Sequence, residues 1–155
     1  VIAAKLGFPN SAKIQGEDLA ALAEKPTDTL KDIVVLPGNC AAPVDDLNWS
    51  PVQLGTEAAR TDFTNESQNM TGSIEVAKLE NDKDRQALQE HFANVSTILA
   101  DCQSNGKSPQ DSLVLITAAG DYAGMVSFVS SKPLDDKTFN QVATSILDTA
   151  MTQVQ

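Results

Sequence analysis

Side chains that build catalytic and metal sites are scarce in this chain of 155 residues, which has one histidine and two cysteines. Zinc needs about three or four convergent ligands, so the sequence predicts no metal site and no cofactor. His91, the only imidazole, falls at the edge of an apolar helical stripe, which favours a boundary residue without a catalytic role. The common motifs of serine hydrolases, zinc proteases and nucleotide-binding loops are absent. We therefore expect a protein that is not an enzyme.

Basic residues and long apolar runs are scarce too. The chain has 11 Lys and Arg against 21 Asp and Glu, a formal net charge of −10. This charge argues against nucleic acid and anionic membrane surfaces as partners. No apolar run approaches the roughly 20 residues that span a bilayer, and the sequence shows no signal peptide. We expect any membrane attachment to come from an anchor upstream of Val1.

Cys40 and Cys102 have only each other as possible disulfide partners. An even cysteine count in an acidic chain rich in Ser, Thr, Asn and Gln favours a bridge over two reduced thiols of a cytosolic protein. A loop of this length would gain about 4 kcal/mol from the bridge in the chain-entropy model. The sequence therefore predicts a Cys40–Cys102 disulfide and an extracellular location.

The clearest periodic pattern predicts a helix over Asn81–Cys102, with an apolar stripe that covers the sheet. Asn81 or Asp82 is expected to cap this helix, because either side chain can accept a hydrogen bond from a free amide of the first turn. The other predicted helices are Glu17–Glu24 and, after a cap at Asp135, a segment whose apolar face lies within Phe139–Val154.

Short apolar or alternating segments predict strands, two pairs of which form antiparallel hairpins. Hairpins with single helices between and after them predict an α+β fold, an antiparallel sheet of about five strands with helices packed on one side. We expect a single domain over residues 1–155, with residues 1–15 as a peripheral terminus in which Val1–Leu6 is an edge strand or a docked end. The five predicted strands are Ile33–Leu36, Glu57–Thr64, Ser73–Leu79, Leu113–Ile116 and Met125–Val129.

Four residues are candidates for ligand binding. Arg60 and Glu75 are predicted on the non-core faces of neighbouring strands, where they either pair structurally or line a cleft. Trp49, in an irregular segment after Asp45 and Asp46, is either part of a binding lip or a large core residue. Tyr122, just beyond the turn at Gly120, completes the set.

The order of features resembles a known family. A short helix, the run Pro37-Gly38-Asn39-Cys40, a polar hairpin with Gly72-Ser73-Ile74-Glu75-Val76 and a helix ending at Asp101-Cys102 resemble the extracellular sensor domains of actinobacterial PknH-type kinases and related secreted lipoproteins. The resemblance covers most of Leu19 to Val154. It implies a mixed α+β fold with a sheet and a cleft, displayed outside the membrane. Such domains commonly carry two disulfides, whereas this chain can form only one, which favours the lipoprotein relatives.

These observations predict a non-enzymatic extracellular ligand-binding or sensor domain of the bacterial cell envelope, from a lipoprotein or membrane-anchored protein. Its ligand is expected to be a small molecule, a lipid or a cell-wall component. Two alternatives remain: a secreted hydrolase that uses carboxylates or a free cysteine, and a structural or protein-interaction module with an acidic surface.

Overall fold

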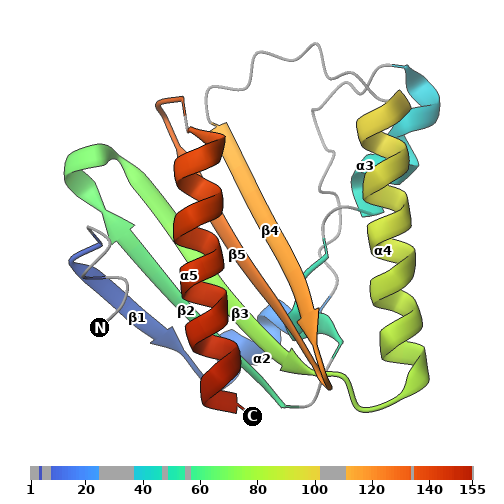
Figure 1. Ribbon diagram of the computed structural model, residues 1–155, viewed down its shortest axis with the longest axis horizontal. Coiled ribbons are helices and arrows are strands. Elements are labelled where there is room, and N and C mark those ends of the chain that lie inside the picture. Colours follow the sequence, from blue (N-terminus) through green and yellow to red (C-terminus); the bar gives the residue numbers. More distant parts are fainter. Residues whose placement is uncertain are drawn as a thin grey trace.

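Antiparallel strands and helices form one compact body in the computed structural model (Figure 1). The structure describes residues 4, 8–24, 37–46, 49–54, 57–101, 111–133 and 135–154. In this part of the chain five strands form an open sheet in the order β1-β2-β3-β5-β4, which confirms the predicted α+β class and the five-stranded antiparallel sheet. The elements are β1 (Asn10–Ile14), α2 (Glu17–Ala23), η1 (Gly38–Cys40), α3 (Ala41–Asp46), η2 (Pro51–Gln53), β2 (Ala58–Asn65), η3 (Glu66–Gln68), β3 (Met70–Lys78), α4 (Asp82–Asp101), β4 (Asp111–Ala119), β5 (Tyr122–Ser130) and α5 (Asp136–Val154).

Two hairpins supply four of the strands, at the places that the sequence pattern predicts. β2 returns as β3 through η3, and β4 returns as β5 through a tight turn at Gly120 and Asp121. Gly120 has φ +59°, a conformation that costs glycine little and that a two-residue hairpin turn of this kind needs at its first position. β3 and β5 pair along their whole length, so they join the hairpins at the centre of the sheet.

The fifth strand, β1, is not the one that the sequence predicts. It pairs with β2 at one edge of the sheet, so residues 10–14 belong to the sheet. Its side chains are mostly exposed and polar, and they give no apolar alternation by which a strand could be recognised. The strand predicted at Ile33–Leu36 lies outside the described residues, as do Cys102 and all of Val1–Leu6 except residue 4.

One face of the sheet, which we call the α5 face, is covered by α5 (Figure 1). Val126 and Phe128 of β5 point to this face and pack against Phe139 and Leu147 of α5 in the main apolar core. Gly124 lies on the same face, where a Cβ atom would come within 2.8 Å of the Leu147 side chain. The missing side chain therefore lets the helix approach the strand closely.

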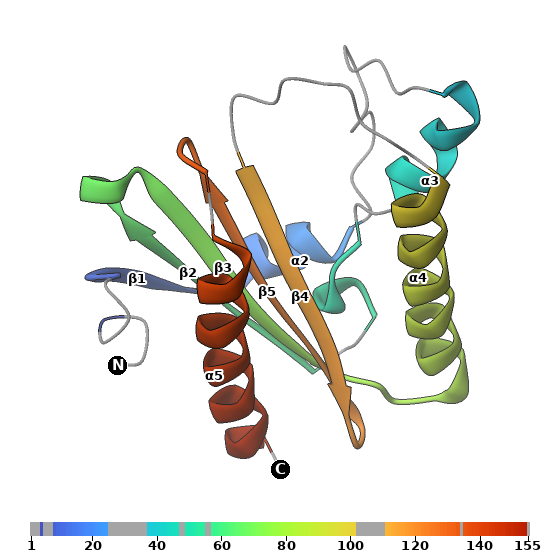
Figure 2. The same cartoon turned by 45° about the horizontal axis from the view of Figure 1, so that its top comes forward.

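The other face, which we call the back face, is covered at one end by η2, against which α2 packs. Figure 2 shows α5 and α2 on opposite sides of the sheet. The helices are thus divided between two faces, whereas the sequence pattern predicts them on one side. The reason is that β5 carries apolar residues on both faces, so each face needs a cover. A second apolar cluster forms at this end from Trp49, Leu54, Leu79, Leu88, Ile116 and Ala123.

Helix α4 confirms the longest predicted helix over its described residues, but it stands beside β4 and does not lie over the sheet (Figures 1 and 2). Leu88 of this helix packs in the second apolar cluster. Further along, the Asn94 Nδ2 donates a hydrogen bond of 3.1 Å to the backbone oxygen of Pro43 in α3. No helix in the described ranges is long and apolar enough to cross a membrane.

Candidate functional site

An ion pair between Arg60 and Glu75 lies on the back face. The two residues are directly opposite each other in β2 and β3, and Arg60 Nη1 is 2.6 Å from Glu75 Oε1. Glu75 is fully buried, while the Arg60 side chain keeps 22% of its surface exposed. The second oxygen of Glu75 accepts a long hydrogen bond of 3.4 Å from the backbone N–H of Val52 in η2. The sequence prediction that these two residues pair across the hairpin is thus fulfilled in the structure.

Asp62 is the second carboxylate on this guanidinium. Arg60 Nε donates to Asp62 Oδ1 at 2.6 Å, and 40% of the Asp62 side chain is exposed. Burial lowers the pKa of Arg60, but the hydrogen bond to Asp62 and the charges of Glu75 and Asp62 raise it, and the net direction is upward. Arg60 therefore stays charged and holds Asp62 in a fixed position at the surface.

Small polar side chains continue from Asp62 across the back face. Asp62 is opposite Ser73, which is opposite Ser127, and the two hydroxyl oxygens of the serines are 2.8 Å apart. One step further along the strands, Thr64 is opposite Thr71. We call Thr64, Thr71, Ser73 and Ser127 the hydroxyl row. Hydroxyl groups both donate and accept hydrogen bonds, so beside a carboxylate they suit a neutral polar ligand.

Trp49 lies on the back-face side of the sheet as well, at the covered end. Its ring stacks on His91 of α4, with centroids 4.5 Å apart and an interplanar angle of 26°. His91 is buried; this burial lowers its pKa, and a hydrogen bond to the backbone of Asp46 only partly opposes the change. Trp49 thus follows the core-filling alternative of the sequence analysis, and His91 is a buried packing residue.

Tyr122 is separated from the other three candidates. It lies two positions before Gly124 in β5, so it points toward the α5 face, and it is opposite Lys78 in β3. The structure therefore brings Arg60 and Glu75 into contact, places Trp49 on the same side of the sheet and places Tyr122 on the other side.

The hydroxyl row and the role of Asp62 are absent from the sequence prediction. Alternation does put Asp62 on the same face as Arg60. The neighbours Ser73 and Ser127 are 54 positions apart in sequence, and their contact depends on the register between β3 and β5. No local pattern specifies that register, so the sequence alone offers no signal for the row.

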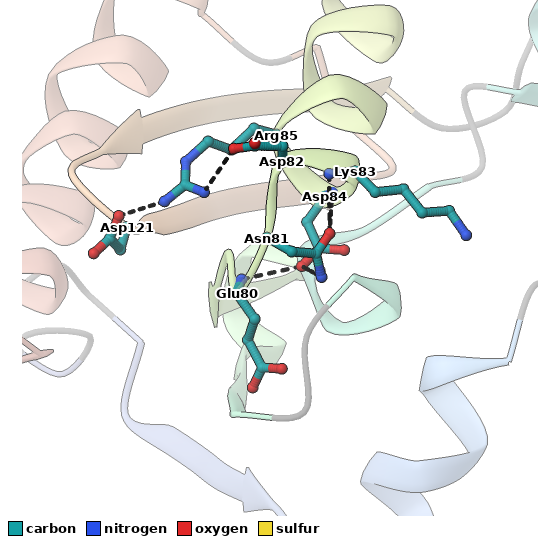
Figure 3. Close-up of polar contacts among 7 residues, drawn as sticks. All are labelled: Glu80, Asn81, Asp82, Lys83, Asp84, Arg85 and Asp121. Atoms are coloured by element: carbon teal, nitrogen blue, oxygen red, sulfur yellow. Dashed lines mark hydrogen bonds and ion pairs between the residues drawn. The ribbon is translucent and has the colours of Figure 1, made fainter.

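The charged residues at the start of α4 form a structural cluster (Figure 3). Asn81 Oδ1 accepts hydrogen bonds from the backbone N–H groups of Lys83 and Asp84, which confirms the predicted cap. Asp84 in turn accepts a bond from the backbone N–H of Glu80. Arg85 reaches Asp121 in the β4–β5 turn at 2.5 Å, so the cluster fastens α4 to the sheet.

Cys40 is buried in η1, and Cys102 lies outside the described residues, so the disulfide between them stays a prediction. Within the described ranges no group of three or more His, Cys, Asp and Glu side chains is arranged to hold a metal ion. No protein-family model, curated protein or solved structure matches the chain. The resemblance to extracellular sensor domains therefore remains a prediction.

Proposed function

We propose that this chain is a non-enzymatic, extracellular ligand-binding or sensor domain of the bacterial cell envelope, carried by a lipoprotein or a membrane-anchored protein. The observation that carries the proposal is the hydroxyl row beside Asp62, whose position is fixed by Arg60. A fixed carboxylate next to several hydroxyl groups is the kind of preorganised polar surface that orients a ligand.

Binding is favoured over hydrolysis because the carboxylates of the site are already engaged. Carboxylate-based glycoside hydrolysis needs two carboxyl groups that flank the scissile bond with space between them. Here the guanidinium of Arg60 lies between Asp62 and Glu75 and bonds to both. Glu75 is fully buried as well, so a substrate would have to displace both Arg60 and η2 to reach it.

The chemistry of the row favours a neutral or amine-bearing ligand with many hydroxyl groups. The chain carries a net charge of −10, which disfavours acidic ligands, and Asp62 adds a local negative charge. Sugars and amino sugars of the cell wall fit this description better than lipid tails, because an apolar ligand would cover these hydroxyl groups without offering them hydrogen-bond partners.

A titration of the isotope-labelled chain with soluble N-acetylglucosamine oligomers tests the proposal. We expect amide shifts concentrated at Thr64, Thr71, Ser73 and Ser127, with saturation in the micromolar to millimolar range that is usual for polar sites. Asp62→Ala should weaken binding about tenfold, the effect of one lost charge-assisted hydrogen bond. Asp148→Ala, at an exposed position on α5, is the matched control and should leave binding unchanged.

Three outcomes would contradict the proposal. The first is the absence of shifts with the neutral oligomers, their amino-sugar counterparts and other soluble cell-wall fragments. The second is shifts confined to α5, and the third is release of shorter sugars during the titration, which would indicate a hydrolase. Lipid vesicles in a parallel titration test the lipid alternative, and we expect no binding to them.

A further inference from the structure

The two edges of the sheet differ in how they are protected. β1 forms one edge and has five residues, which are mostly exposed and polar and include Lys13. Short edge strands with a lysine are a common defence against pairing with another chain. β4 forms the other edge and has nine residues, in continuous register with β5 from Asp111 to Ala119. It contains no bulge, proline or lysine, so the strand itself has none of the features that usually protect an edge.

The hairpin turn shows which backbone groups of β4 face outward. In a two-residue hairpin the residues next to the turn, here Ala119 and Tyr122, exchange hydrogen bonds, and bonded pairs then recur at every second position. Leu113, Leu115 and Thr117 therefore bond to β5. The N–H and C=O groups of the even-numbered residues, from Ser112 to Ala118, point away from the sheet, where no other described strand pairs with them.

One of these outward positions also exposes an apolar side chain. Val114 has 52% of its surface exposed. It is one of two large apolar residues that are exposed in the described part of the chain. Its side chain lies on the back face beside Ser127, at the open end of the hydroxyl row. A strand added at this edge would bury part of Val114 in addition to pairing the free backbone groups.

From this edge we propose that β4 binds an extended, positively charged peptide segment of another protein as a sixth, antiparallel strand. The charge of the chain selects this partner over a second copy, because two chains that each carry −10 repel one another. Backbone pairing would supply the affinity, and the net negative charge of the chain would supply the preference for a basic segment.

Amide hydrogen exchange on the full chain tests this proposal without any substitution. The probe is an amidated nine-residue peptide of alternating Lys and Val, which matches β4 in length. In the free protein we expect slow exchange at Leu113, Leu115 and Thr117 and fast exchange at Val114 and Ala118. Saturating peptide should slow the even-numbered amides about tenfold or more and leave the odd-numbered ones unchanged. A peptide with Glu in place of Lys should bind at least about tenfold more weakly.

Each other outcome would overturn the proposal. Weak protection of amides spread over the chain, without the alternation in β4, would mean non-specific attraction. Slow exchange of the even-numbered amides in the free monomer would mean that the chain itself covers the edge. The same protection in a species that sediments as a dimer would make a second copy the occupant.

A pair of variants at one position adds a second test. Val114→Pro removes an outward N–H that β5 does not use, whereas Val114→Thr keeps this donor and a similar shape. Peptide affinity should fall about tenfold or more in the proline variant and stay within about twofold in the threonine variant. Slow exchange at Leu113 and Leu115 in both variants would show that the sheet is intact. Equal affinity of both variants for the peptide would contradict pairing at this edge.

Discussion

Arg60 and Glu75 face each other directly across β2 and β3, with Arg60 Nη1 2.6 Å from Glu75 Oε1. The carboxylate is fully buried and has no contact with bulk water. Its charge is compensated by this guanidinium and by the N–H of Val52. A buried ion pair adds little over an apolar pair of the same shape, because both charges lose their hydration. Removing one member alone is much more costly, since it leaves a buried charge without a partner.

Arg60→Met should therefore destabilise the protein by about 3 kcal/mol, measured as the free energy of unfolding in urea at neutral pH. The double variant Arg60→Met with Glu75→Leu should recover most of this loss, because no buried charge remains. Lys13→Met, an exposed substitution on β1, serves as the control for loss of a positive charge. A single Arg60 variant as stable as the control would show that the pair does not hold the hairpin together.

Part of this fold could be predicted from sequence because the relevant signals are local. Helix α5 follows its cap Asp135, whose carboxylate accepts the N–H of Thr138, and Arg60 and Glu75 share a face because side chains alternate along adjacent strands. Strand β1 could not be predicted, since polar residues at an edge leave no apolar pattern. The Ser73–Ser127 contact could not be predicted either, because it depends on long-range register between β3 and β5.

Gly72 is a second position where a small change should have a large effect. It lies on the α5 face of β3, and a Cβ atom there would collide with the rings of Phe63 and Phe128. Both rings are buried in the main core, so they have little space to move. Gly72→Ala should lower the free energy of unfolding by about 1–3 kcal/mol, the usual cost of overpacking.

The matched substitution for Gly72→Ala is Gly38→Ala in η1. Gly38 has open space where the new methyl group would lie and does not have a positive φ. This variant should be neutral or more stable by up to about 1 kcal/mol, because alanine restricts the unfolded chain. If both variants unfolded at the same urea concentration, the close approach of the aromatic rings at Gly72 would be refuted.

The cap of α4 gives a third prediction. Asn81 Oδ1 accepts two backbone N–H groups, at 2.9 Å from Lys83 and 3.1 Å from Asp84 (Figure 3). Asn81→Ala removes both bonds and should cost about 1 kcal/mol in urea unfolding, whereas Asn81→Asp keeps an acceptor and should cost less. Equal losses for the alanine and aspartate variants would argue that the contacts of Asp84 and Arg85 set the start of the helix instead.

The last prediction concerns pH and His91. Burial holds the pKa of His91 below its ordinary value of 6.5, so the unfolded chain binds a proton at a higher pH than the folded protein does. Stability should therefore be independent of this group well above about pH 7 and fall as the pH decreases through 6.5 toward the lower pKa of the folded state. His91→Phe removes the titration and keeps an aromatic ring against Trp49.

The measurement is the unfolding temperature between about pH 7.5 and 5.5, a range in which ordinary carboxylates remain charged. Wild-type protein should lose more stability over this range than His91→Phe, and the two profiles should run parallel at the upper end. Fluorescence of Trp49, the only tryptophan, follows the same transition and reports directly on the stacked ring. Parallel profiles over the whole range would mean that His91 gains a proton as readily in the folded state as in the unfolded chain, which its burial against Trp49 argues against.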